Sequence, residues 1–276
     1  CNDLSRTTYS GSDYVMFSDT LSMYPVQDSE KWFEIPVVAT NICDYDRSFG
    51  VEVDDKASNA IEKKQYVVES NTVTIKAGER VAKFRMKGVY ENIGKTDSLS
   101  VTFNLLAKDE NIWDLYGTRT RVQMQKACPF ELSTFEGYCL LTSSFFSAYM
   151  TNTEHRLLQA ERDKAEDNTI ILHDFFYKNY DLKIKYDPSD PLKPFVEFDE
   201  QIIGSTAEAF GTIYGNGKLM CDQPVAYDSY YNVCQKFVIL YTTIYVVGKG
   251  TVGTYVNILE WISDEEAEQY KKEEGL

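Results

Sequence analysis

Hydrophobic and polar residues alternate with a period of two along most of the first half of the chain. The clearest run is residues 99–105, where Leu, Val, Phe and Leu alternate with Ser, Thr and Asn. This period places successive side chains on opposite faces of a β-strand. Similar runs occupy residues 14–17, 33–40, 49–53, 73–76, 82–87 and 121–125. About seven short strands separated by turn signals predict an antiparallel sandwich of the immunoglobulin-like kind over residues 14–126.

The alternation breaks at Ala127-Cys128-Pro129, because proline cannot continue a paired strand. We therefore place a domain boundary there, with a second β-rich domain over residues 127–262. Its strands are predicted at residues 137–142, 169–172, 182–186 and 195–198. Asn216-Gly217 predicts a tight hairpin over residues 210–220, and residues 248–250 join two long apolar runs, 237–247 and 251–259. A second sandwich or a small barrel satisfies this pattern. The chain is thus predicted to be all-β.

Three local features are less regular. Residues 153–167 contain good helix formers without Gly or Pro, so both a helix and a charged hairpin remain open. Pro36 favours an edge position for the strand over residues 33–40. Ser263 and Glu266 have the spacing of a capping box, so the charged tail, residues 263–276, is predicted to form a short helix. This helix lacks an apolar stripe and is expected to be solvated.

Residues 73–84 resemble the Calx-beta family, in which a strand, an apolar-x-x-Gly-Glu turn and a second alternating strand follow one another. Residues 49–53, 64–69 and 98–105 fit the neighbouring strands of that family. The resemblance implies a Calx-beta-like sandwich over residues 14–126. Calcium-binding members gather acidic residues at one end, and this chain has acidic residues in predicted loops at 44, 46, 54–55 and 109–110. Calcium is therefore a possible ligand; no other cofactor and no metal-ligating set is predicted.

The chain starts at Cys1, and a polar stretch follows over residues 2–12. A cysteine in this position is typical of the mature start of a bacterial lipoprotein, so Cys1 is the predicted lipidation site and residues 1–13 the linker; the alternative is a sequence that begins at an arbitrary cysteine. The whole chain resembles the two-domain surface lipoproteins of Bacteroides-type bacteria. That resemblance implies anchorage to the outer membrane of the cell envelope through the lipid on Cys1, and a role in adhesion or glycan association.

Composition and net charge limit the classes of partner that the chain is expected to bind. Hydrophobic residues make up 43% and charged residues 26% of the chain, which is a globular balance. The net charge of −15 disfavours nucleic acid, whose phosphates need clustered Lys and Arg. Two cysteine pairs, Cys128/Cys139 and Cys221/Cys234, are close enough in sequence to bridge hairpins. Alternatively, most cysteines, including Cys43, are small buried residues.

Catalytic motifs are scarce. The only histidines, His155 and His173, form no HExxH motif. Residues 248–253 spell GxGxxG, but a predicted strand follows where a dinucleotide site needs a helix. The carboxylate pairs Asp187/Asp190 and Asp199/Glu200 match a glycosidase only in residue type. We therefore expect a protein that is not an enzyme, with a hydrolase as one alternative.

Aromatic residues make up 14% of the chain. Tyr227, Tyr230 and Tyr231 lie among Asp, Ser and Asn, which is typical of tyrosine-rich contact loops that bind glycans or proteins. These three tyrosines are the predicted ligand-binding residues. The predicted function is contact with a glycan, an envelope protein or a host protein, in adhesion or nutrient capture, by a monomer. A structural spacer or assembly subunit of an envelope complex is the second alternative.

Overall fold

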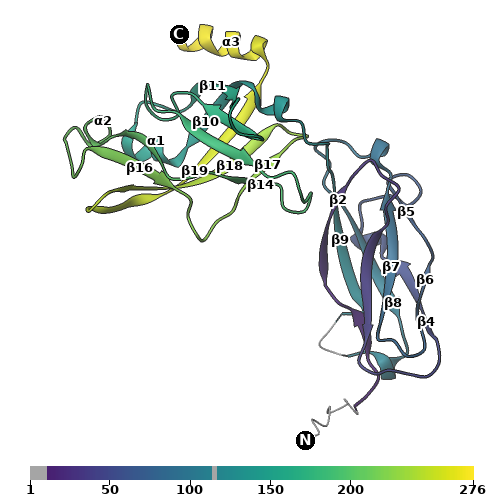
Figure 1. The fold of residues 1–276 in the computed structure, drawn as a ribbon. Coiled ribbons are helices and arrows are strands. Elements are labelled where there is room, and N and C mark those ends of the chain that lie inside the picture. The colour runs from purple at the N-terminus through teal and green to yellow at the C-terminus, as the bar shows by residue number, and fades with distance from the viewer. Residues whose placement is uncertain (1–10, 114–116) are drawn as a thin grey trace, which may run out of the picture. The chain divides into compact units, whose positions relative to one another are not determined.

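A computed structural model describes residues 11–113 and 117–276. Strands account for 45% of the chain and helices for 13%, so the predicted all-β class is confirmed. The chain divides into two compact units, residues 1–127 and residues 128–276. Figure 1 shows the first unit in purple to teal and the second in teal to yellow.

Unit 1 is a two-sheet sandwich whose apolar residues face inward. Met86, Val101 and Ile75 are fully buried, and the rings of Phe84 and Phe103 meet edge-to-face at 4.9 Å. Short 3-10 helices connect the strands at Asp55–Ala57, Tyr90–Asn92 and Asp109–Asn111. The first sheet has the order β1 (Val15–Phe17), β3 (Phe33–Ala39), β7 (Val81–Gly88), β5 (Tyr66–Val68). The second has the order β2 (Leu21–Val26), β9 (Arg119–Lys126), β8 (Leu99–Leu106), β4 (Arg47–Val53), β6 (Thr72–Ile75).

Two details of this sandwich correct the sequence-based expectation. Strand β2 pairs with β9 in parallel, so the sandwich is not wholly antiparallel. The edge position predicted from Pro36 is wrong, because β3 lies between β1 and β7. Strand β1 ends at Phe17, opposite Val37. Beyond that end, the Ser18 backbone N–H donates to the Pro36 carbonyl at 3.0 Å, so this pair lacks only the second hydrogen bond that a proline N–H cannot donate.

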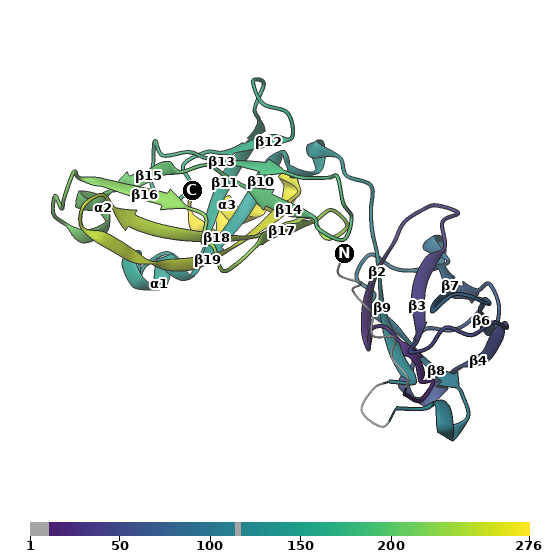
Figure 2. The ribbon, with the colours of Figure 1, turned by 60° about the horizontal axis from the view of Figure 1, so that its bottom comes forward.

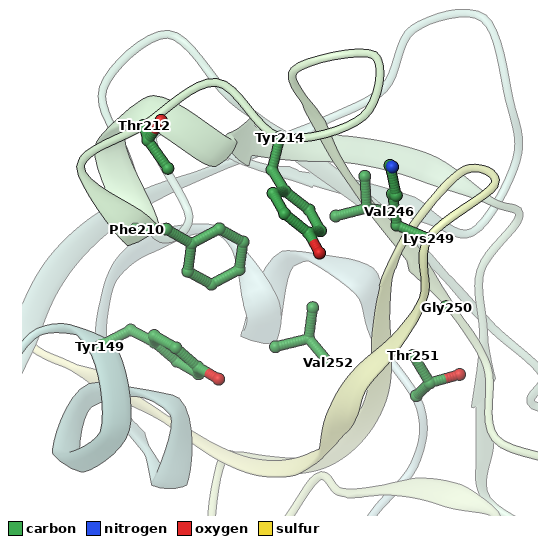
Figure 3. A pocket seen from close by; sticks show the side chains of 9 residues that line it. All are labelled: Tyr149, Phe210, Thr212, Tyr214, Val246, Lys249, Gly250, Thr251 and Val252. Carbon is green, nitrogen blue, oxygen red and sulfur yellow. The ribbon is translucent and has the colours of Figure 1, made fainter.

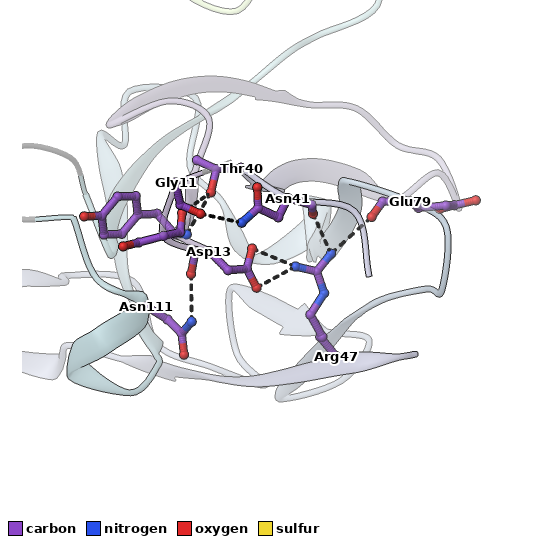
Figure 4. A network of polar contacts seen from close by, with 9 residues as sticks. Gly11, Asp13, Thr40, Asn41, Arg47, Glu79 and Asn111 are labelled. Atoms are coloured by element: carbon purple, nitrogen blue, oxygen red, sulfur yellow. Dashed lines mark hydrogen bonds and ion pairs between the residues drawn. The ribbon is translucent and has the colours of Figure 1, made fainter. Parts of the chain in front are cut away.

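A buried arginine fastens the N-terminal segment to unit 1 (Figure 4). The side chain of Arg47 is 6% exposed and donates to both carboxylate oxygens of Asp13 at 2.9 Å. It also donates to the backbone carbonyls of Asn41 at 3.0 Å and Glu79 at 3.1 Å. The amide of Asn111 donates to the backbone carbonyl of Asp13 at 2.7 Å. Because charge-assisted hydrogen bonds are stronger than neutral ones, this network fixes where residues 11–14 enter the sandwich.

Unit 2 is an antiparallel sheet closed into an eight-stranded barrel. Leu141, Ile184 and Leu240 are among its fully buried inner residues. Strands β15 (Gln201–Ser205) and β16 (Lys218–Asp222) extend the sheet beyond the barrel, where β16 pairs with the second half of β18. Around the barrel the order is β10 (Gly137–Ser143), β11 (Arg156–Arg162), β12 (Thr169–Leu172), β13 (Leu182–Tyr186), β14 (Phe195–Glu197), β17 (Ser229–Asn232), β18 (Phe237–Val246), β19 (Gly250–Ile262).

Helices cover parts of this barrel. A 3-10 helix, Leu132–Phe135, precedes β10, while α1 (Ser144–Tyr149) follows β10 and α2 (Thr206–Phe210) follows β15. Figure 2 shows α2 beside the far ends of β15 and β16. The capping box of Ser263 and Glu266 is present and starts α3 (Asp264–Glu274). Most of this helix is exposed, as expected of a solvated tail, but Ala267 is fully buried and Lys271 donates to the Tyr138 hydroxyl at 2.9 Å, which ties the helix to β10.

Three local predictions have different outcomes in unit 2. Residues 156–162 form β11, paired on both sides, so the helix alternative is wrong. The long closing hairpin is confirmed as β18 and β19. The tight hairpin at Asn216-Gly217 is wrong: β16 pairs with β15, and α2 lies between these strands. The dipeptide only closes the turn that enters β16.

One disulfide is present in unit 2. It joins Cys128 and Cys234 across 106 residues, with their Cα atoms 5.2 Å apart. Neither pair predicted from spacing forms, because β10 and β16 bury the thiols of Cys139 and Cys221. Burial raises the pKa of both thiols, which keeps them protonated. The alternative of small buried residues holds for these two cysteines.

Candidate functional site

The three predicted contact tyrosines do not form a loop. Residues 229–232 are strand β17, whose period of two places neighbouring side chains on opposite faces. Tyr231 is 6% exposed inside the barrel, and its hydroxyl donates to the Asp187 carbonyl at 3.1 Å. Tyr231 therefore cannot contact a ligand from the surface, and this part of the prediction is corrected. Tyr230 points outward and is 39% exposed.

The two outward tyrosines lie beside other aromatic and apolar side chains. Tyr227 is 56% exposed and stacks on Tyr241 with ring centroids 5.1 Å apart. Across the sheet, Tyr230 lies opposite Ile239, which lies opposite Ile258. Exposed apolar patches of this kind mark contact surfaces in many proteins. Tyr227 and Tyr230 thus remain candidate ligand residues on the outer face of β17–β19.

A concave site lies at the far end of the β18–β19 hairpin, on the inner face of these strands, opposite the face of Tyr230 (Figure 3). It is a pocket of about 400 Å³, within the size range of small-ligand sites. Figure 3 shows the rings of Tyr149, Phe210 and Tyr214 turned towards the hollow, with Val252 facing them. Its remaining lining residues are Thr212, Val246, Lys249, Gly250 and Thr251.

Two glycines shape this end of β19, and one of them, Gly250, lines the pocket. Gly250 lies opposite Val246 and Gly253 opposite Ile244, so both occupy inner positions of β19 that a side chain would otherwise fill. The register shifts at this point in the hairpin, as a β-bulge does when it leaves one residue without a partner. A Cβ atom at Gly253 would lie 2.7 Å from the hydroxyl oxygen of Tyr255, so that ring fits only beside a glycine.

The wall containing Phe210 and Tyr214 is built by a short helix and its termination. Ser205 caps the start of α2, and Gly211, with φ of 73°, ends it after five residues. This left-handed conformation favours glycine and turns the chain back sharply. The buried Thr206 hydroxyl then accepts a hydrogen bond from the Tyr214 backbone N–H at 2.9 Å. These contacts hold both rings at the pocket.

The wall containing Tyr149 is fixed by a buried polar network. The Ser143 hydroxyl caps α1 and donates to the Asn257 side-chain oxygen at 2.6 Å. The Asn257 amide in turn donates to the Thr242 hydroxyl at 3.0 Å. This network ties α1 to β18 and β19. Burial, together with a hydrogen bond to Tyr149, raises the pKa of Tyr255 to about 12.

Within the part of the chain that the structure describes, Lys249 is the only charged residue that lines the pocket. Its ammonium lies 5.4 Å from the centroid of the Tyr214 ring. A Cβ atom at Gly215 would lie 3.0 Å from Lys249 Cγ, so the loop before β16 closely approaches the lysine stem. The site therefore combines aromatic faces and hydroxyl groups with one cation at its rim.

Sequence reasoning missed this pocket. Phe210 and Tyr214 lie in a glycine-rich segment whose sequence predicts a tight hairpin. Tyr149 ends a six-residue helix that no pattern indicated. The available signal was two aromatic residues on either side of Gly211 in a segment with several turn formers, which suits a loop that presents rings better than a paired strand.

The other predicted candidates have ordinary partners or lie outside the described residues. The lipidation site Cys1 lies outside them. Asp187 accepts hydrogen bonds from Ser189, which lower the pKa of the carboxyl, whereas a general acid needs a raised one. In the described part of the chain, no group of three or more His, Cys, Asp or Glu side chains is arranged to hold a metal ion. Calcium binding therefore remains a prediction from the sequence.

The histidines make local contacts. His155 Nδ1 lies 2.9 Å from the Thr142 hydroxyl. His173 lies between two carboxylates, 3.1 Å from Asp181 and 3.2 Å from Glu161. Burial alone would lower the pKa of His173, but the hydrogen bonds to these carboxylates outweigh it and raise the pKa. His173 thus joins β11 to the start of β13.

Together, the fold and the pocket define a two-unit β protein whose second unit is a closed antiparallel barrel with an aromatic pocket at one end. The family model described as a domain of unknown function (DUF4984) matches residues 115–273, more than half of the chain. The chain belongs to this family. No curated protein matches it.

Solved structures show distant similarity. The Calx CBD1 domain is 15% identical, with 43% of this chain and 100% of that chain covered and a TM-score of 0.34. A Bacteroides ovatus protein of unknown function is 9% identical, with 89% and 90% covered and a TM-score of 0.37. An auxiliary nutrient binding protein from Bacteroides thetaiotaomicron is 10% identical, with 88% and 91% covered and a TM-score of 0.32. Likenesses this distant carry no information on the ligand of this chain.

Within residues 11–113 and 117–276, no helix has the length and apolar composition needed to span a bilayer.

Proposed function

We propose that this protein is a non-enzymatic saccharide-binding protein of the cell envelope and that the pocket of Tyr149, Phe210 and Tyr214 is its binding site. The observation that carries the proposal is the convergence of three aromatic rings on a hollow of about 400 Å³. Aromatic faces attract the C–H groups of a sugar ring. Hydroxyl groups at the same site supply the hydrogen bonds that orient a polar ligand.

A glycan-array screen of the full chain, with and without calcium, tests this function, and matched tyrosine variants locate the site. Tyr214 is 52% exposed and Tyr227 is 56% exposed, so alanine at either position should leave the fold intact. Tyr214→Ala should weaken saccharide binding roughly tenfold, or by about 1.4 kcal/mol, while Tyr227→Ala leaves it unchanged. The reverse result would assign binding to the outer face of β17–β19. Calcium dependence would support the acidic loops of unit 1.

The same screen tests the alternatives. Release of new reducing ends from a bound saccharide would support a hydrolase instead. A negative array would overturn saccharide binding and leave a protein partner or a structural spacer as the function. Envelope anchorage is a separate part of the proposal: metabolic labelling with a fatty acid should modify the wild-type chain and not a Cys1→Ser variant. Size-exclusion chromatography of that variant tests the proposed monomer.

A further inference from the structure

We infer that the pocket prefers saccharides that carry an anionic group, a carboxylate or a sulfate, and that Lys249 is the residue that selects them. This inference rests on the proposed saccharide function and specifies its ligand class. Among the described residues that line the pocket, Lys249 is the one cation and none is a carboxylate. The chain as a whole carries a net charge of −15. Although the protein as a whole is acidic, an anion that enters the pocket would thus meet an ammonium group and no carboxylate among the lining residues.

The ammonium of Lys249 is also available to a ligand. Among the described residues, no carboxylate forms an ion pair with it, whereas Lys183 and Lys271 each have one. Its neighbour is the face of Tyr214 at 5.4 Å, an arrangement that attracts a cation without neutralising its charge. An anionic substituent on a sugar stacked against Tyr214 would therefore lie within reach of the ammonium.

Local geometry restricts where the ammonium can be. Lys249 lies in the turn between β18 and β19, and its backbone N–H donates to the Val246 carbonyl at 3.0 Å. On the other side, Gly215, with φ of 58°, closely approaches the lysine stem. A side chain held at its base loses less conformational entropy on binding than a free one, which favours recognition by this residue.

The test compares charged and neutral forms of one saccharide by isothermal titration calorimetry with the full chain. The probes are galacturonate oligosaccharides and their carboxyl-reduced counterparts, together with sulfated galactan oligosaccharides and their desulfated counterparts. We expect the anionic form of at least one pair to bind about threefold to tenfold more tightly, with the difference shrinking as salt increases. The pair that shows the difference identifies the anion as a carboxylate or a sulfate.

Lys249→Met keeps most of the stem and removes the charge. It should abolish the preference by weakening binding of the anionic form alone. The matched control is Lys218→Met, an exposed lysine on β16 that does not line the pocket; it should retain the preference. Equal affinity for charged and neutral forms, or equal loss of both in Lys249→Met, would overturn the inference while leaving saccharide binding intact. Absence of binding by every probe and on the array would overturn both proposals.

Discussion

Tyr230 and Tyr231 are neighbours in sequence but should differ sharply in their effect on stability. Tyr231 lies in the barrel interior, with ring centroids 5.2 Å from Tyr186 and 5.8 Å from Phe135. Tyr230 is on the outer face and makes one edge contact, with Phe237 at 6.4 Å. Tyr231→Ala should therefore destabilise unit 2 strongly, and Tyr230→Ala only slightly.

The magnitudes follow from burial. An aromatic side chain removes roughly 150–250 Å² from water, worth roughly 4–6 kcal/mol at about 25 cal/mol per Å². This is an upper bound because the unfolded chain already buries part of that area. Aromatic-to-alanine changes in protein cores cost about 3–5 kcal/mol, which is the expected loss for Tyr231→Ala. Tyr231→Phe removes only the hydrogen bond to Asp187 and should cost about 1 kcal/mol, as should Tyr230→Ala.

Urea denaturation of the full chain measures these differences if the reporter lies in unit 2. Trp261 is suitable because its ring contacts Phe135 at 5.1 Å, and Phe135 also contacts Tyr231. Replacing Trp32 and Trp113 with Phe makes Trp261 the only tryptophan. The slope of free energy against urea should stay constant. A loss below about 1.5 kcal/mol for Tyr231→Ala, or equal losses for both alanine variants, would refute the assignment of Tyr231 to the core.

Three further predictions use the same denaturation assay. The double variant Cys128→Ser/Cys234→Ser should lose about 2–5 kcal/mol in unit 2, because the disulfide closes a loop of 106 residues; no loss would contradict a bond there. The pKa of His173 is raised in the folded state, so its stabilising contribution is fully present below about pH 6.5 and is lost as pH rises through the folded pKa. The difference in unfolding free energy between wild type and His173→Gln should therefore be larger at pH 6 than at pH 9, and a constant difference would exclude this linkage. Asp13→Asn should lower the unfolding free energy of unit 1 by about 1.5–3 kcal/mol, because it weakens the hydrogen bonds to the buried Arg47 guanidinium. The fluorescence of Trp32 and Trp113, with Trp261 replaced by Phe, reports this change, and an unchanged urea midpoint would show that the ion pair does not hold the N-terminal segment.

The candidate site was less predictable than the fold. Strand β8 was recognisable because burial of one face imposes a two-residue period, and β18 because it is a long run of β-branched and aromatic residues; both are local properties of the sequence. The parallel pairing of β2 with β9 left no such signal, since strand direction depends on which segments meet. The pocket depends on a five-residue helix ended by Gly211 and on Gly250 opposite the larger Val246, and neither feature has a period.

The sequence by itself determined the all-β class, the sandwich over residues 14–126, the closing hairpin of β18 and β19 and the capping box of α3. These features depend on side chains within a few residues of one another, or on alternation along one strand. Only the tertiary structure decided that Tyr231 lies inside and Tyr230 outside, that Cys128 pairs with Cys234 and that Tyr149, Phe210 and Tyr214 meet. Barrel closure sets the inward direction of each strand and brings distant segments together, and no pattern within one segment contains that information.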